Sequence, residues 1–182
     1  MAEKKIKVLA VSGSLRSTSS NTTLVRWIQT LLPANIEYTV YDALKEIPPF
    51  DDSGEGPVPV TQWKQCVEEA DGVLICSPEY AFGVPGVLKN ALDWAVSSTV
   101  FSNKPVALIT AASSGEKAHA AMLHTLTAIG TLVSPQTSLL ISFIRSKLNK
   151  EGEVIDAGTM QQISALLNSF LMQIENSHLA GA

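Results

Sequence analysis

Short apolar runs alternate along the chain with stretches in which apolar residues recur at helical spacing. The apolar runs are rich in β-branched side chains, as buried strands are. They predict strands at Ile6–Val11, Ile36–Ala43, Val73–Cys76 and Pro105–Thr110, with a fifth at either Leu132–Val133 or Leu139–Phe143. The helical spacing predicts helices at Asn21–Leu32, Thr61–Ala70, Val87–Ser97, Glu116–Ile129 and Ala157–Glu175.

This alternation predicts an α/β fold, in which a parallel sheet carries helices on both faces. With 182 residues and 46% hydrophobic content, the chain can bury a substantial core, and we expect one domain over residues 1–182. Ligands of such sheets bind at the carboxyl ends of the strands, beside a topological switch point. The loops after the first, third and fourth strands have unusual compositions, so we expect them to converge on one site.

One irregular segment, Ile47–Val60, is longer than most connections in a compact domain. It contains four prolines and two glycines. A length and composition of this kind indicate a lid or an oligomer contact rather than a simple link.

Charge and cysteine content narrow the range of partners. A formal net charge of −4 argues against a nucleic-acid partner, because such binding needs clustered Lys and Arg. Cys66 and Cys76 form neither a C-x-x-C pair nor a metal-spaced set with histidine, and they suit a reducing cytoplasm. The N-terminal residues give no sign of an export signal. The uncharged segment Ala118–Ile144 is long enough to span a bilayer, but polar residues, a glycine and a proline interrupt it, so we expect no membrane span.

The loop after the first strand is a candidate anion site. It precedes a helix whose free N–H groups and positive end point toward it. The glycine spacings of a Rossmann fingerprint and of a P-loop are both absent. The loop instead offers many hydroxyls, Asn21 as the expected helix cap and one guanidinium, that of Arg16, and this set favours a terminal monophosphate. The alternative is that Ser and Thr are simply common in loops and caps.

Two further loops have compositions suited to a flat ring. Prolines and glycines constrain the segment SPEYAFGVPG at residues 77–86, so it is a shaped turn that can present backbone groups to a heterocycle. Tyr80 or Phe82 would border the face of that heterocycle, although a structural turn with buried aromatics is the competing interpretation. The third loop, Ala111–Gly115, is small enough to let a ring approach the backbone.

These residues resemble a known family. GSLRSTSSN at residues 13–21 resembles the phosphate loop G-S-x-R-x-x-S-x-N, and SPEYAFGVPGVLKNALDW at residues 77–94 resembles a second motif, of the flavodoxin-like NAD(P)H-dependent FMN reductases, which include quinone, chromate and azo-dye reductases. The resemblance implies a flavodoxin-like three-layer sandwich with a five-stranded parallel sheet in the order 2-1-3-4-5. It also implies FMN as cofactor, with NADPH or NADH as a transient electron donor.

The resemblance also assigns the cofactor-binding residues. Those that would hold the phosphate are Ser14, Arg16, Ser19, Ser20, Asn21 and Thr22. Those that would line the isoalloxazine are Pro78, Glu79, Tyr80, Ala81, Phe82 and Gly83, with Ser113, Ser114 and Gly115 closing its far edge. Two positions depart from the motif, because Ala81 stands where the family usually has Asn and Gly83 where it often has Ser. We therefore expect a side-chain contact to the flavin to be missing there.

The mechanism implied by the resemblance is hydride transfer from nicotinamide to FMN and onward to quinones, free flavin or similar small acceptors. The flavin performs this chemistry, so no catalytic side chain and no metal are expected. His119 and His124 are five positions apart on a helix and are expected to be packing or surface residues. The resemblance further implies a homodimer or homotetramer. The alternatives are a flavodoxin-like electron carrier, which the lack of an acidic run disfavours, and a flavin-free binding module.

Overall fold

Five parallel strands form one sheet in the order β2-β1-β3-β4-β5 within residues 5–52 and 54–180, the part of the chain that the computed structural model describes. The strands are β1 (Ile6–Ser12), β2 (Ile36–Tyr41), β3 (Gly72–Ser77), β4 (Val106–Ala112) and β5 (Ser138–Ser142). All four pairings are parallel, with Val8 opposite Gly72 and Val73 opposite Val106. The predicted sheet and its strand order are confirmed.

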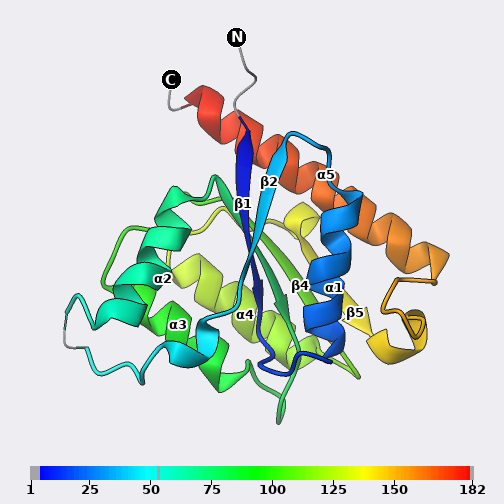
Figure 1. Ribbon diagram of the computed structural model, residues 1–182, viewed down its shortest axis with the longest axis horizontal. Coiled ribbons are helices and arrows are strands. Elements are labelled where there is room, and N and C mark those ends of the chain that lie inside the picture. Colours follow the sequence, from blue (N-terminus) through cyan, green and yellow to red (C-terminus); the bar gives the residue numbers. More distant parts are fainter. Residues whose placement is uncertain (1–4, 53, 181–182) are drawn as a thin grey trace.

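Helices cover both faces of the sheet (Figure 1). One layer consists of α2 (Val58–Glu69), α3 (Gly86–Val96) and α4 (Glu116–Ala128), and the other of α1 (Ser20–Ile28) and α5 (Ala157–Ala180). Short 3₁₀ turns occur at Gln29–Leu31, Leu44–Glu46, Pro135–Thr137 and Ile144–Lys147. The three-layer sandwich predicted from the resemblance is therefore confirmed.

Two of the interior strands, β3 and β4, are buried on both faces, which explains their nearly unbroken apolar sequences. Successive side chains of a strand point to opposite faces. Val73 and Ile75 accordingly pack in the cluster of α2, α3 and α4, whereas Leu74 and Cys76 pack in the cluster of α1 and α5. The core thus fixes the register that brings the carboxyl ends of the strands to one edge.

Several element boundaries differ from the sequence prediction. The first helix was expected to begin at Asn21 with that residue as its cap, but it begins at Ser20 and Ser19 is its N-cap. The fifth strand follows the second of the two alternatives, Leu139–Phe143, since β5 covers Ser138–Ser142. The other alternative contributes only an isolated bridge between Leu132 and Pro105.

The first residues of the irregular segment Ile47–Val60 are clamped onto α3. The side chain of Asn90 accepts a hydrogen bond from the backbone of Phe50 and donates one to the carbonyl of Pro48, at 2.8 and 2.9 Å. The Trp94 indole also donates to the Pro48 carbonyl, and its ring meets that of Phe50 edge to face. Ser53 lies outside the described residues. These hydrogen bonds give Asn90 and Trp94 on α3 a structural role in holding the segment.

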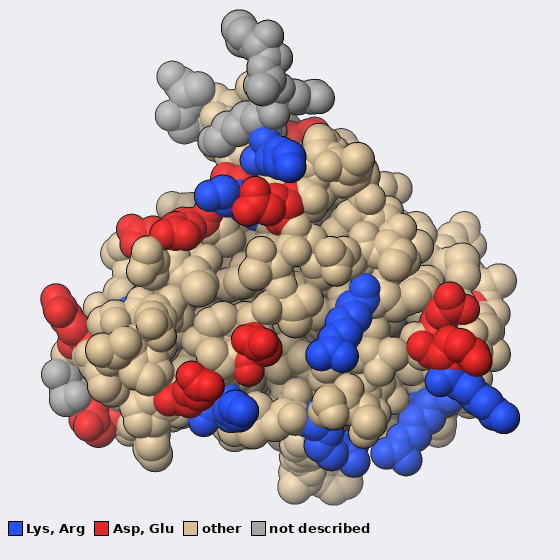
Figure 2. Space-filling view, viewed as in Figure 1, with Lys and Arg blue, Asp and Glu red and all other residues tan. Residues whose placement is uncertain are grey.

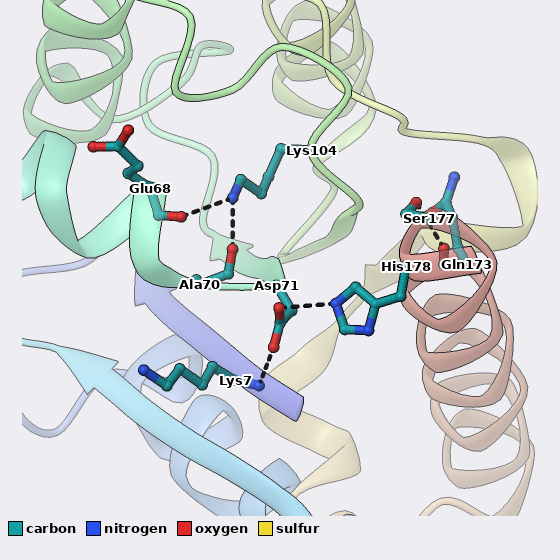
Figure 3. Close-up of polar contacts among 8 residues, drawn as sticks. All are labelled: Lys7, Glu68, Ala70, Asp71, Lys104, Gln173, Ser177 and His178. Carbon is teal, nitrogen blue, oxygen red and sulfur yellow. Dashed lines mark hydrogen bonds and ion pairs between the residues drawn. The ribbon is translucent and has the colours of Figure 1, made fainter. Parts of the chain in front are cut away.

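Asp71 joins three elements at the amino edge of the sheet, opposite the edge described below (Figure 3). Its carboxylate accepts a hydrogen bond from the backbone N–H of Lys7 and contacts Nε2 of His178 on α5, both at 2.8 Å. Nearby, the ammonium of Lys104 donates to the carbonyl oxygen of Ala70 at 2.5 Å, and burial lowers the pKa of this lysine. The contact between Asp71 and His178 holds α5 against the starts of β1 and β3.

Candidate functional site

A cleft of about 290 Å³ opens at the carboxyl edge of the sheet, where the loops after β1, β3, β4 and β5 meet. Its lining residues come from all four loops: Arg16, Ser19, Ser20, Asn21, Pro78, Glu79, Tyr80, Ala111, Ala112, Ser113, Phe143, Ile144, Arg145 and Ser146. The volume is near the lower end of the range for small-molecule sites. The expected convergence of the three loops is therefore observed, together with a fourth loop.

Hydroxyl groups of the first loop divide into those that shape the loop and those that face the cleft. The Thr22 hydroxyl lies 2.9 Å from the Ser19 hydroxyl, 3.0 Å from that of Ser12 and 3.1 Å from the carbonyl oxygen of Arg16. Ser19 also caps α1, since its oxygen accepts the Thr22 N–H at 3.0 Å. Thr22 does not line the cleft, so among the predicted phosphate residues its hydroxyl serves the shape of the loop.

Asn21 connects α1 to two strands beneath the cleft. Its amide donates to the carbonyl oxygen of Ala111 at 2.9 Å, and its side-chain oxygen accepts from the thiol of Cys76 at 3.2 Å. Burial raises the pKa of Cys76, which keeps this thiol protonated and able to donate. The expected capping role was wrong because Ser19, two residues earlier, supplies the cap. Asn21 instead holds the start of α1 in register with β3 and β4.

The second loop places three of its predicted residues in the cleft and three outside it. Pro78, Glu79 and Tyr80 line the cleft, and the Tyr80 hydroxyl lies 3.4 Å from that of Ser14. Beyond them, Tyr80 and Gly83 exchange backbone hydrogen bonds around Ala81 and Phe82, which have φ of 49° and 59°. This is the geometry of a tight two-residue turn. Ala81, Phe82 and Gly83 do not line the cleft, and the Phe82 side chain is 77% exposed.

Glu79 links the second loop to the third. Its carboxylate oxygens accept hydrogen bonds from the backbone N–H groups of Gly115 and Ala118, at 3.3 and 3.0 Å. Gly115 is the N-cap position of α4 and carries no side chain that could cap the helix. The Glu79 carboxylate therefore accepts from two of the N–H groups at the start of α4, and its charge lies at the positive end of that helix.

The third loop places Ser113 in the cleft, whereas the exposed Ser114 and the buried Gly115 do not line it. The Ser114 carbonyl accepts a hydrogen bond from the Ser142 hydroxyl at 2.8 Å. Gly115 has φ of +96°, and a Cβ there would lie 2.7 Å from a Leu140 methyl, so the close packing of this loop requires glycine. Ser114 and Gly115 thus shape the loop and do not line the cleft.

Sequence reasoning missed the fourth loop, which supplies Phe143, Ile144, Arg145 and Ser146 to the cleft. The available signal was the position of these residues directly after a strand, since every strand of a parallel sheet ends at the same edge. Because the fifth strand was left at either Leu132–Val133 or Leu139–Phe143, the loop that follows it could not be placed. Arg145 gives the cleft a second guanidinium besides that of Arg16, and both are exposed.

Other expected features lie outside the cleft. His119 has Nδ1 2.8 Å from the Thr110 hydroxyl, and its partial burial lowers its pKa, whereas His124 is exposed. The described residues contain no group of three or more His, Cys, Asp and Glu arranged to hold a metal ion. No helix in the described ranges is long and apolar enough to cross a membrane.

Comparison with known proteins agrees with this arrangement. The family model described as NADPH-dependent FMN reductase matches residues 6–145. A quinone reductase of Escherichia coli K12 is 30% identical over 177 residues, which cover 92% of this chain and 94% of the relative. An NADPH:quinone oxidoreductase of Arabidopsis thaliana is 32% identical, with coverage of 90% and 89%. Among solved structures, the flavoenzyme NAD(P)H:(acceptor) oxidoreductase FerB of Paracoccus denitrificans superposes with a TM-score of 0.82 at 27% identity, covering 94% of this chain and 98% of that one.

Proposed function

The chain belongs to the NADPH-dependent FMN reductase family, and on that premise we propose that it uses FMN held in the cleft to reduce quinones or similar small acceptors with electrons from NADPH or NADH. When bound, FMN supplies the redox chemistry, taking hydride from nicotinamide and passing reducing equivalents to the acceptor. The side chains of the protein bind and orient the reactants. No acid, base or nucleophile among them is required.

The observation that carries this proposal is the polar end of the cleft. Arg16, Ser19 and Ser20 line it beside the N-terminus of α1. This set fits a phosphate monoester, because the Ser20 hydroxyl and N–H groups at the start of α1 would donate to its oxygens and the Arg16 guanidinium would offset its charge, while the Ser19 hydroxyl stays bound to Thr22 and shapes the loop. Hydrogen bonds to a charged group contribute about 1.5–3 kcal/mol each, so a few of them account for micromolar or tighter binding, which needs about 8 kcal/mol.

The other end of the cleft suits a flat ring. We propose that Pro78, Tyr80 and Ser113 contact it, with Glu79 acting as the tie between the two loops that carry them. Ser14, Asn21 and Thr22 would support the phosphate end through their contacts with Tyr80, with the Ala111 carbonyl oxygen and with the Arg16 carbonyl oxygen, respectively. Ala81, Phe82, Gly83, Ser114 and Gly115 would act through the shape of their loops.

The names of the relatives support an acceptor class, and the charges of the described surface disfavour an electron carrier. Two of them are named for quinones, which supports a quinone as the acceptor class. An electron carrier would present a strongly acidic docking face. The charged residues lining this cleft are two arginines and Glu79, whose carboxylate binds the N-terminus of α4. Positive and negative side chains are also interspersed over the face drawn in Figure 2.

We also propose that the protein works in the cytoplasm as a homodimer or homotetramer. Cys66 and Cys76 are both free thiols, which suits a reducing compartment. Several large apolar side chains are exposed, among them Phe82 at 77% and Val96 at 62%, and the proposed oligomer would bury those that lie at its interfaces. Light scattering coupled to size exclusion would give the mass in solution, and a monomer would contradict the oligomer.

Flavin uptake followed by turnover tests the central proposal. The purified apoprotein is titrated with FMN while its visible spectrum is recorded, and NADPH or NADH is then added with a soluble quinone. We expect stoichiometric uptake and oxidation of the nicotinamide. Absence of uptake would contradict the enzyme and carrier proposals alike, whereas uptake without quinone-dependent oxidation would favour the carrier.

A further inference from the structure

Phe143 is an exposed aromatic residue in an unfavourable backbone conformation at the edge of the cleft. It follows β5 directly, its side chain is 71% exposed, and its φ is 55°. A bulky residue with positive φ is an outlier, because its Cβ approaches the following carbonyl oxygen. Burial of the ring cannot compensate for this strain, since most of the ring remains in solvent.

Hydrogen bonds from neighbouring elements hold Phe143 in this conformation. Its N–H donates to the carbonyl oxygen of Ser113 at 3.2 Å, and its own carbonyl accepts from the backbone N–H and the hydroxyl of Ser146, at 3.0 and 2.9 Å. The next residue, Ile144, is turned into the core and is 3% exposed. The backbone therefore buries Ile144 while presenting the Phe143 ring at the cleft. Strain that the surroundings enforce in this way is concentrated at ligand sites.

Tyr80 occupies the corresponding position on the other side of the third loop. It also lines the cleft and is 48% exposed. Tyr80 follows β3 and Phe143 follows β5, and these strands flank β4, whose own loop contributes Ser113. The partly exposed rings of Tyr80 and Phe143 thus border the cleft on either side of the third loop.

We propose that Phe143 is a stacking wall for a planar ring system bound in the cleft, an inference that rests on the proposed function. Aromatic faces pair favourably in offset or edge-to-face arrangements and remove apolar surface from water. The ring is either the flavin itself or a flat acceptor seated beside it, since both present the same chemistry. Phe143 lies outside both sequence motifs quoted above, so this role is additional to the residues they assign.

Three substitutions at this one position separate the ring from the backbone. Phe143→Asn removes the ring and introduces a residue that tolerates positive φ, Phe143→Leu keeps an apolar side chain without the aromatic face, and Phe143→Tyr keeps the ring. For each variant, FMN affinity is measured by quenching of flavin fluorescence on the apoprotein. The KM and kcat for a soluble quinone and the melting temperature are measured as well.

We expect Phe143→Asn to melt at or above the parent temperature and to weaken either FMN affinity or the quinone KM by about two- to tenfold, the range of one aromatic pair. A change in FMN affinity identifies the flavin as the stacked ring, and a change confined to KM identifies the acceptor. Phe143→Tyr should match the parent in both, and Phe143→Leu should lie between. Parent-like FMN affinity and KM in the Asn variant, or a marked loss of its stability, would overturn the inference. A parent protein that binds no FMN would instead overturn the proposed function and this inference with it.

Discussion

The Glu79 carboxylate is the most informative single group to change, because it stabilises two loops at once. It accepts hydrogen bonds from Gly115 and Ala118 at the start of α4 and belongs to the loop that also carries Tyr80. Replacing it with Gln retains one acceptor oxygen and removes the charge. Replacing it with Ala removes both acceptors and leaves the donors of the helix without a protein partner.

The size of the effect follows from these contacts. Loss of a helix N-cap costs about 0.5–2 kcal/mol, and an anion near a helix N-terminus contributes about 0.3–1 kcal/mol. Glu79→Gln, which loses the charge and one of the two bonds, should lower the free energy of unfolding by about 1–2 kcal/mol. Glu79→Ala should lower it by about 2–3 kcal/mol, with a larger loss of FMN affinity because the two loops are no longer tied.

Urea unfolding of the apoprotein gives the free energies, and flavin titration gives the affinities. Glu116→Gln is the matched control. Glu116 is an exposed residue in the first turn of α4, so its substitution removes only a charge that interacts with the helix dipole. The expected order of destabilisation is Glu79→Ala, then Glu79→Gln, then Glu116→Gln. Equal stability of Glu79→Gln and Glu116→Gln would refute the capping role assigned to this carboxylate.

Three other substitutions test the remaining parts of the molecule. Arg16→Ala should weaken FMN binding at least tenfold, the equivalent of about 1.4 kcal/mol, without lowering the melting temperature, whereas Arg26→Ala in the last turn of α1 should leave binding unchanged. Equal FMN affinities of the Arg16→Ala variant and the parent would exclude Arg16 from the phosphate site. Burial lowers the pKa of His119 below its usual 6.5, so as the pH falls the unfolded chain binds a proton before the folded one does, and the free energy of unfolding should fall below pH 6.5. His119→Asn should reduce this dependence of the free energy of unfolding on pH, measured by urea titration between pH 7 and 5. An unchanged dependence would contradict the role given to His119. Ala81→Asn should raise stability by a few tenths of a kcal/mol to about 1 kcal/mol and leave FMN affinity unchanged, which thermal melts and flavin titration would check.

The architecture could be predicted because the interior strands can be recognised from their own apolar sequences. The runs at Val73–Cys76 and Pro105–Thr110 are apolar except for Thr110, because both faces of these interior strands are covered, and this pattern can be recognised without knowing the neighbouring strands. The end of the sheet was harder to assign. In β5 only Ile141 is fully buried, so an edge strand of intermediate burial resembles the nearby Leu132–Val133 in sequence.

The site was predicted as far as local composition allows. The hydroxyl-rich loop and the loop at residues 77–86 do meet in one cleft, because parallel strands bring their carboxyl ends together. Which loop residues line the cleft and which shape the loops depends on contacts with other helices and strands. Nothing in the local sequence indicates that Glu79 caps a helix 36 positions away, or that the amide of Asn21 bonds to Ala111. Such roles emerge only when the sheet order is known.

The departures from the family motif at Ala81 and Gly83 illustrate the same point. From sequence, Ala in place of Asn implied a lost contact with the flavin. In the structure Ala81 and Phe82 are the two central residues of a tight turn, both with positive φ, and neither lines the cleft. Asn is favoured in such turns because it tolerates the left-handed conformation. The substitution therefore acts first on the backbone, so Ala81→Asn separates the two interpretations: a gain in stability alone supports the turn, whereas a gain in FMN affinity alone supports a contact with the flavin.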